Sequence, residues 1–240
     1  MGEIITMTAD AILKEIKPLG TENYRKVLLN HGVGEPCYGV KIGDLKKVQK
    51  RVEKDYQLAL DLYETGVYDA MYLAGLIADD DRMTKRDLRR WVKKARGPLA
   101  GSTVAWVAAE SRYGMELARE WIESDKDFMA ESGWATLCCL VALKADAELD
   151  LRELEGLLQR AENAIHDSPD DVRYQMNGFV ISVGCYVEPL SKAAIKVAKR
   201  IGRVQVDMGN TACKVPVATE MIGKVIERGS LGKKRKTVKC

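Results

Sequence analysis

The feature that most constrains the fold is a helical pattern that returns at nearly regular intervals along the chain. Stretches rich in small apolar residues start near Val67, Leu99, Trp134 and Tyr174, which lie 32, 35 and 40 residues apart. Each follows an amphipathic stretch that ends at a polar break. Paired helices that repeat at about 33–47 residues are typical of an α-solenoid. The pattern therefore predicts helical pairs that stack and bury one continuous core.

Residues 121–143 show this unit most clearly. Ser124 and Asp125 interrupt an amphipathic stretch and can cap a new helix. After them, apolar residues recur mostly three or four positions apart, as in a helix. Small residues lie among these, namely Ala130, Gly133, Ala135, Cys138 and Cys139. Because such a helix lets its neighbours approach on more than one side, we expect it to be buried.

The remainder of the chain predicts an all-α fold. Only residues 203–207 (RVQVD) alternate like a strand, and this run is too short to change the class. We expect a single domain over residues 1–240, an α-α superhelix of antiparallel helix pairs. Its second helices would line a concave groove, which is the usual binding face of such stacks. An ordinary helical domain with irregular spacing is the alternative.

Composition excludes several classes of function. The hydrophobic fraction of 46% and the charged fraction of 30% are ordinary for a globular protein. The six cysteines include no C-x-x-C pair, and no apolar run reaches the length of a membrane span. No nucleotide-binding, zinc-protease or serine-hydrolase motif occurs, and His31 and His166 are interpreted as structural. We therefore expect a cytoplasmic protein with no membrane contact, no metal and no cofactor.

The net charge of +3 is unevenly distributed. Residues 224–240 contain seven Lys or Arg and one Glu, so this basic C-terminal tail carries +6 and the remainder of the chain −3. Clustered cations bind phosphates by displacing condensed counterions. The residues Lys233, Lys234, Arg235 and Lys236 are accordingly predicted to bind double-stranded DNA without reading its sequence. A tail that is only solvated is the alternative.

Three motifs, in this order and spacing, resemble a known family. They are residues 38–47 (YGVKIGDLKK), the W-I-x-S-D sequence at residues 121–125, and residues 172–179 (VRYQMNGF). The segment that contains them is similar to AlkD-type DNA alkylation-repair proteins. This resemblance implies a HEAT-like α-superhelix whose concave basic face holds duplex DNA. Enzymes of that family excise cationic alkylated purines without a metal and without flipping the base into a pocket.

The sequence departs from the family where the catalytic acid is expected. Family enzymes carry a W-W-D-x-x-D-like segment whose aspartate is thought to stabilise the cationic sugar. Residues 96–106 (RGPLAGSTVAW) contain no carboxylate. Glu110 and Glu131 are the candidate substitutes, because an oxocarbenium-like centre needs a nearby negative charge. The alternative is that both are exposed helix acids, which is the commoner case for such residues.

Three further residues lie on second helices and are expected at or near the concave face: Trp134, Arg173 and Phe179. The competing interpretation is that Trp134 and Phe179 are buried core aromatics. Three functions stay open at this point. The chain is a DNA-binding superhelix with altered or absent glycosylase activity, an active alkylpurine DNA glycosylase with a relocated acid, or a protein-binding scaffold.

Overall fold

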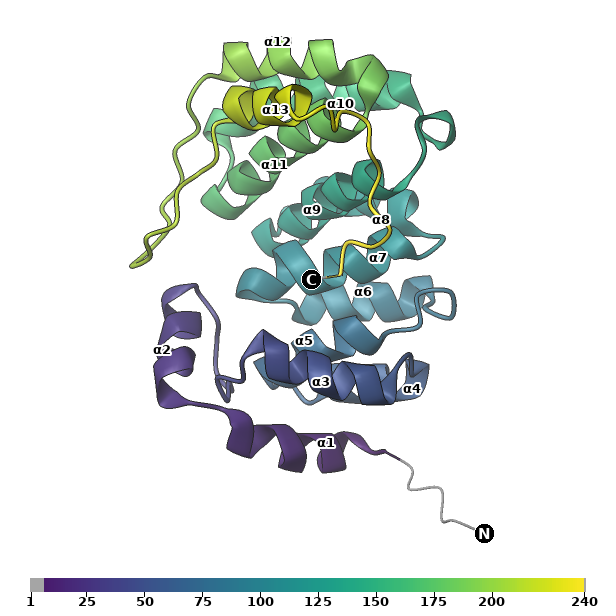
Figure 1. The fold of residues 1–240 in the computed structure, drawn as a ribbon, viewed down its shortest axis with the longest axis vertical. Coiled ribbons are helices and arrows are strands. Elements are labelled where there is room, and N and C mark those ends of the chain that lie inside the picture. The colour runs from purple at the N-terminus through teal and green to yellow at the C-terminus, as the bar shows by residue number, and fades with distance from the viewer. Residues whose placement is uncertain (1–6, 240) are drawn as a thin grey trace.

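The computed structural model describes residues 7–239, and within them the chain forms helices, turns and extended segments but no strand. The helices stack in pairs along one long axis, from α1 at one end to α12 and α13 at the other (Figure 1). The expected all-α class is confirmed. The α-helices are α1 (Ala9–Ile16), α2 (Glu22–Asn30), α3 (Ile42–Val52), α4 (Tyr56–Glu64), α5 (Tyr68–Ile77), α6 (Lys85–Lys94), α7 (Ala105–Glu110), α8 (Gly114–Ile122), α9 (Asp127–Leu143), α10 (Leu151–Ala164), α11 (Asp170–Tyr186), α12 (Ser191–Ile201) and α13 (Ala218–Glu227).

The inner layer is made of α5, α7, α9 and α11, and α9 packs on both α8 and α11. Small residues permit this close packing. A Cβ on Gly133 would lie 2.7 Å from the backbone nitrogen of Ile122 in α8, and one on Gly75 would lie 2.3 Å from Cγ2 of Thr103. The buried helix expected within residues 121–143 is therefore α9, and the backbone of α8 leaves no room for a side chain at its Gly133.

The outer helices are amphipathic, and ion pairs join each to the next. Lys85 of α6 pairs with Glu116 of α8 at 2.6 Å. Arg119 of α8 pairs with Glu153 of α10, and Arg200 of α12 pairs with Glu162 of α10. The partners are 31 to 38 residues apart in sequence, so the ladder follows the helical repeat. Exposed pairs of this kind contribute little stability, about 0.2–1 kcal/mol each.

A long extended excursion, which we call the arm (residues 202–217), separates α12 from α13. It leaves the stack and turns back at a tip that lies toward α2 (Figure 1). At its base, Arg173 donates to the carbonyl oxygen of Gln205 at 2.7 Å, and the Asp207 N–H donates to Asp170 at 2.9 Å. Near its tip, the sulfur of Cys213 lies 3.6 Å from Nε2 of His31. The arm thus connects the last repeats to the first.

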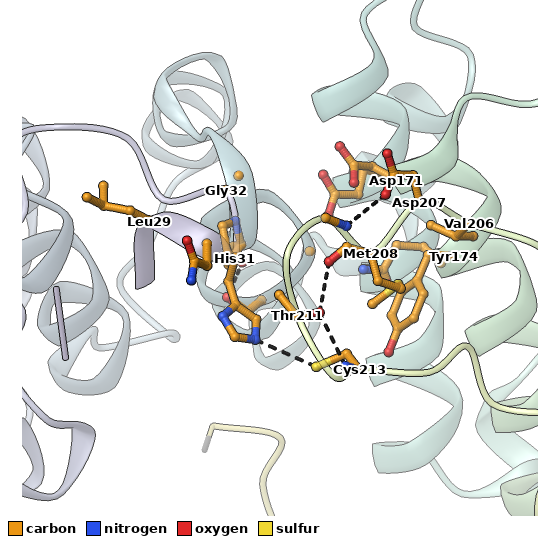
Figure 2. Close-up of a pocket in the computed structure, with 18 residues that line it drawn as sticks. Leu29, His31, Gly32, Asp171, Tyr174, Val206, Asp207, Met208, Thr211 and Cys213 are labelled. Carbon is orange, nitrogen blue, oxygen red and sulfur yellow. Dashed lines mark hydrogen bonds between the residues drawn. The ribbon is translucent and has the colours of Figure 1, made fainter. Parts of the chain in front are cut away.

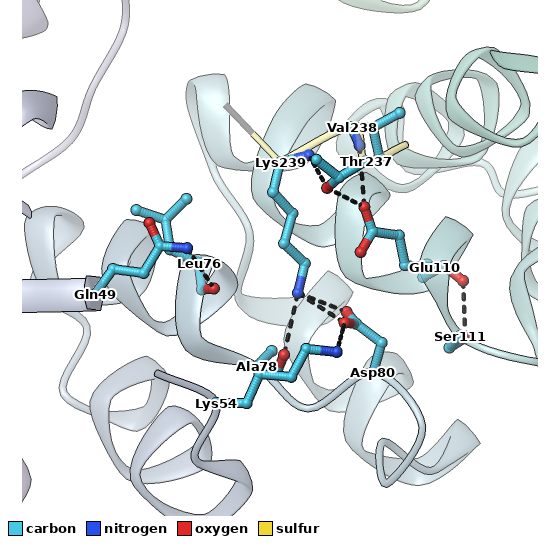
Figure 3. Close-up of polar contacts among 11 residues, drawn as sticks. Gln49, Lys54, Leu76, Ala78, Asp80, Glu110, Ser111, Thr237, Val238 and Lys239 are labelled. Carbon is cyan, nitrogen blue, oxygen red and sulfur yellow. Dashed lines mark hydrogen bonds and ion pairs between the residues drawn. The ribbon is translucent and has the colours of Figure 1, made fainter. Parts of the chain in front are cut away.

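The segment predicted as a basic tail is a packed part of the fold. Its first residues complete α13, and the chain then runs back over the middle of the stack as a strap (residues 229–239). The backbone N–H of Arg235 donates to the carbonyl of Ala142 at 2.8 Å. Val238 is buried in the core, and Lys239 pairs with buried Asp80 at 2.8 Å (Figure 3). The segment is therefore packed on the fold and is not a free tail, although whether its exposed cations bind DNA or are only solvated stays open.

Among residues 7–239, no single helix is long and apolar enough to cross a membrane. Segments Asp170–Tyr186 and Glu188–Ile201 reach that length only together, and a bend of 113° separates them.

Candidate nucleic-acid interface

A pocket of about 800 Å³ opens where the arm meets the inner helices and the end of α2 (Figure 2). Its walls come from five regions that are distant in sequence: residues 29–32, residues 97–102, the start of α9, the start of α11, and arm residues 206–213. A pocket of this volume accommodates a small ligand or a single nucleotide.

Glu131 of α9 is the buried acid of this pocket, with only 7% of its surface exposed. It reaches the pocket beside Gly101, where an added Cβ would lie 2.4 Å from both Glu131 Oε1 and Gln175 Nε2. Gly101 belongs to a π-helical turn, Ala100–Val104, and such turns are often found at functional sites. Because Gly101 has no side chain, the ends of the Glu131 and Gln175 side chains can occupy the space beside it.

The protonation of Glu131 follows from its surroundings. Burial raises the pKa of this carboxyl to about 8, the negative charge of Asp171 adds to the rise, and a hydrogen bond with Gln175 opposes it. The pKa of Asp171 is itself raised by burial and by Asp170 and Asp127. At neutral pH, Glu131 is therefore mainly a neutral acid that can both donate and accept a hydrogen bond.

The pocket is poorly suited to phosphate, because the acids Asp171 and Asp207 also line it and would repel a second negative charge. Carboxyl groups instead bind hydrogen-bond donors such as the amino groups of base edges. The chemistry of the pocket thus differs from that of the basic strap.

Two of the residues expected at the concave face are in the core. Trp134 is 1% exposed and Phe179 is 0% exposed, so the prediction that they lie at the surface of the groove is wrong. Their rings contact each other edge to face with centroids 5.4 Å apart, between α9 and α11. Because the inner helices are covered on both sides, even their large aromatic residues are enclosed.

Arg173, the third of these residues, lies at the base of the arm. Its guanidinium donates to the carbonyl oxygens of Ile165, Ser168 and Gln205 and forms an ion pair with Asp170. These contacts occupy the side chain and hold the arm against α11. A direct contact of Arg173 with DNA stays a prediction.

The two candidate acids lie in different places. Glu110 accepts hydrogen bonds from the Thr237 hydroxyl at 2.5 Å and from the Val238 N–H at 3.0 Å, so it anchors the strap (Figure 3). It does not line the pocket, whereas Glu131 does. Of the two, only Glu131 is placed to meet a ligand there.

The four basic residues of the tail differ in their exposure to solvent. Lys234 is half-buried, pairs with Asp146 at 2.8 Å and donates to the carbonyl of Val141. Lys233, Arg235 and Lys236 are exposed on the strap. Binding of phosphate by these residues stays a prediction, and three of the four have side chains available for it.

Sequence reasoning missed the π-helical turn at Gly101, the pocket residues Tyr174 and Gln175, and the contact of the arm with α2. The break at residues 96–98 signals an irregular connection but not its geometry. The pair formed by His31 and Cys213 spans 182 residues, so no local pattern indicates it.

Comparisons with known proteins agree with this architecture. Residues 12–213 match the sequence profile of the family described as DNA alkylation repair enzyme. The uncharacterized protein Lmo0209 of Listeria monocytogenes is 34% identical over 228 residues, which cover 92% of this chain and 99% of the relative. The uncharacterized protein Lin0241 of Listeria innocua is 33% identical over the same length and coverage.

A solved structure is also similar, with a TM-score of 0.89 and 34% identity over 98% of this chain and 100% of the other. It is described as representing a new family of proteins related to the HEAT-like repeat DNA glycosylases, with affinity for branched DNA structures. The stack of helical pairs is accordingly a HEAT-like superhelix.

Proposed function

This chain belongs to the DNA alkylation repair enzyme family, and from that premise we propose that it is a DNA-binding repair protein that prefers branched DNA to linear duplex. The observation that carries the proposal is the similarity, along nearly the whole chain, to a protein with affinity for branched DNA. Because the similarity covers 98% of this chain, it includes the part that carries the arm.

The geometry supports this preference. A branch point differs from a duplex in offering unpaired bases and strands that diverge. The pocket of about 800 Å³ is too small for a duplex but has room for a nucleotide, and its carboxyl and amide groups suit the edge of an unpaired base. The exposed cations Lys233, Arg235 and Lys236 would bind phosphates of a strand outside the pocket.

Excision of alkylated purines is the second candidate function, and Glu131 is the observation that favours it. It is the most deeply buried carboxyl that lines the pocket in the described residues. However, its raised pKa of about 8 keeps it mainly neutral at physiological pH. A neutral acid stabilises a sugar cation much less than a carboxylate does. We therefore expect weak or absent base release.

The binding proposal is tested by competition. A labelled four-way junction is bound at fixed salt, and unlabelled junction or linear duplex of the same length and composition is added. We expect the junction to compete at least about tenfold better, which corresponds to about 1.4 kcal/mol. Equal competition by the two DNAs would refute the preference for branches, and no binding of either would favour a protein-binding scaffold.

The second candidate is tested by single-turnover release of 7-methylguanine from methylated duplex DNA. The expected rate does not exceed the protein-free control, in the parent and in Glu131→Gln alike. Rapid release by the parent that disappears in Glu131→Gln would establish a glycosylase with a relocated acid.

A further inference from the structure

His31, at the end of α2, and Cys213, near the tip of the arm, lie side by side. The proposed DNA binding gives neither residue a role. His31 and Cys213 are 182 residues apart in sequence, and Cys213 Sγ lies 3.6 Å from His31 Nε2 (Figure 2). Both residues line the pocket, and Cys213 is exposed to solvent. A thiol beside an imidazole is the arrangement in which cysteine becomes a nucleophile.

The imidazole is oriented by a third group. Its other nitrogen, Nδ1, lies 2.8 Å from the carbonyl oxygen of Val27, which can only accept a hydrogen bond. Nδ1 therefore carries a proton, and in the neutral ring Nε2 is left with the lone pair that faces the thiol. The Cys213 thiol, the His31 imidazole and the Val27 carbonyl therefore act as nucleophile, base and orienting acceptor, as in other activated nucleophiles.

The thiol is held as well. The Thr211 hydroxyl accepts from the backbone N–H of Cys213 at 3.2 Å and donates to the carbonyl of Met208 at 2.8 Å. This turn fixes the direction of the Cys213 backbone at the arm tip. Since the arm base is held by Arg173 and Asp170, the sulfur is presented to His31 from a supported loop.

We propose that Cys213 and His31 form a nucleophilic site at which the sulfur takes an alkyl group from small, soft carbon electrophiles that enter the pocket. The thiol proton passes to Nε2 of His31, the sulfur forms a bond to the electrophilic carbon, and the leaving group departs with the bonding electrons. The imidazolium then returns its proton to water. The product is a thioether, and no oxidant or metal is needed.

Charge in the pocket agrees with this assignment. The hydrogen bond with His31, together with Thr211, lowers the pKa of the Cys213 thiol. The contact with the Val27 carbonyl, together with Cys213, raises the pKa of His31. The other ionisable groups that line the pocket are Tyr174 and Asp171 of α11, Glu131 of α9 and Asp207 of the arm.

Other cysteines and the second histidine of the chain serve as internal controls for the reactivity of Cys213 and the role of His31. Burial raises the pKa of Cys37 and Cys185 to about 11, and that of Cys138 to about 12. These thiols are expected to react slowly. His166, the second histidine, faces the carbonyl of Ile201 at 2.9 Å and no thiol, so His166→Asn is the matched control for His31→Asn.

The experiment measures alkylation by iodoacetamide, residue by residue, with peptide mass spectrometry in a Cys240→Ser background. In the parent, we expect Cys213 to react at about pH 6.5 roughly tenfold faster than an unperturbed thiol, whose pKa is about 8.5. His31→Asn should remove most of this advantage, while His166→Asn should keep it.

The pH profile of the parent tests the same site without any change at His31. The rate of Cys213 should reach half its maximum below about pH 8.5, the pKa of an ordinary thiol. A Cys213 that reacts like a free thiol in this profile, or equally fast in the parent and in His31→Asn, would overturn the proposal. Neither outcome depends on whether the protein binds branched DNA.

Discussion

At the scale of single residues, the decisive feature of the pocket is an acid that burial keeps protonated. Glu131 has a pKa of about 8 in the folded chain, and an unperturbed value of 4.5 applies to the unfolded chain. Below about pH 4.5, Glu131 is protonated in both the folded and the unfolded chain, so its ionisation does not change the free energy of folding. As the pH rises from there toward about 8, only the unfolded state ionises, and folding becomes progressively less favourable.

We therefore predict that Glu131→Gln, which mimics the neutral acid, stabilises the protein in a pH-dependent way. Near neutral pH the gain in the free energy of unfolding is on the order of 3 kcal/mol, at about 1.4 kcal/mol per pH unit, and it should be small near pH 5. Thermal or urea unfolding at both pH values measures it. The exposed acid Glu155 offers the control Glu155→Gln, which should change little at either pH. A gain that is the same at both pH values would contradict the argument.

The sequence identifies Glu131 as a candidate but cannot show its environment. Its pKa depends on Asp171 and Gln175, which lie 40 and 44 positions further along the chain. For Trp134 and Phe179, the sequence predicts the helix correctly but not the burial of the side chain. Helical periodicity assigns them to inner helices correctly, but it does not reveal that α9 is covered by both α8 and α11. For such helices, the exposure of one side chain is decided by neighbours and not by local pattern.

At the scale of elements, the helices are predictable and the extended segments are not. Inner helices are recognised by small apolar residues and outer helices by amphipathic spacing, and both signals are local. The arm and the strap are stabilised by distant contacts, such as Arg173 with Gln205 and Lys239 with Asp80, which are 32 and 159 positions apart. Their positions therefore cannot be inferred from the residues within them.

The strap is expected to stabilise the fold chiefly through Lys239. The Lys239 side chain is 8% exposed and the Asp80 side chain is 4% exposed, so this ion pair is buried. Burial raises the pKa of Asp80, while Lys239 and Lys54 lower it. Removing one partner of a buried pair typically costs 3–5 kcal/mol, and we predict about 3 kcal/mol for Lys239→Met because Lys54 remains.

Denaturant unfolding measures this effect. Lys236→Met on the exposed side of the same strap is the control and should change stability by less than about 0.5 kcal/mol. Equal effects of the two substitutions would show that the ion pair does not hold the strap.

At the scale of the whole molecule, the strap joins two hydrophobic clusters. One extends from α1 to α9 and includes Val238, and the other extends from α7 to α13. Cys139, Leu143 and Tyr186 pack against both clusters. The strap adds a second connection, since it starts after α13 and ends in the first cluster.

Deletion of residues 229–240 should therefore weaken the coupling between the two halves. We expect calorimetry to show one transition for the parent and a broader or split transition for the deletion variant, because cooperativity depends on the shared contacts. A single sharp transition at the parent midpoint after deletion would contradict this expectation.

The exposed cations of the strap make a separate prediction about DNA. Each phosphate contact contributes about 0.9 to the slope of log K against log salt, so replacing Lys233, Arg235 and Lys236 together by Ala should reduce the slope by nearly three. The control is a triple Ala variant of the exposed lysines Lys46, Lys47 and Lys50 on α3, which changes net charge equally. If both variants lower the slope alike, the strap has no special part in binding.

The pairing of Lys239 with Asp80 also sets an order of events during synthesis. Ribosomes make the chain from its N-terminus, and 159 positions separate the two residues. At about 5–20 residues per second, Asp80 therefore waits roughly ten to thirty seconds for its partner. Until then, the first repeats lack Val238 in their core, and Asp80 has Lys54 but not Lys239 as an ion-pair partner. We therefore expect the N-terminal half of the nascent chain to lack part of its core until the strap is made. The strap then completes the interior of a region that was translated much earlier.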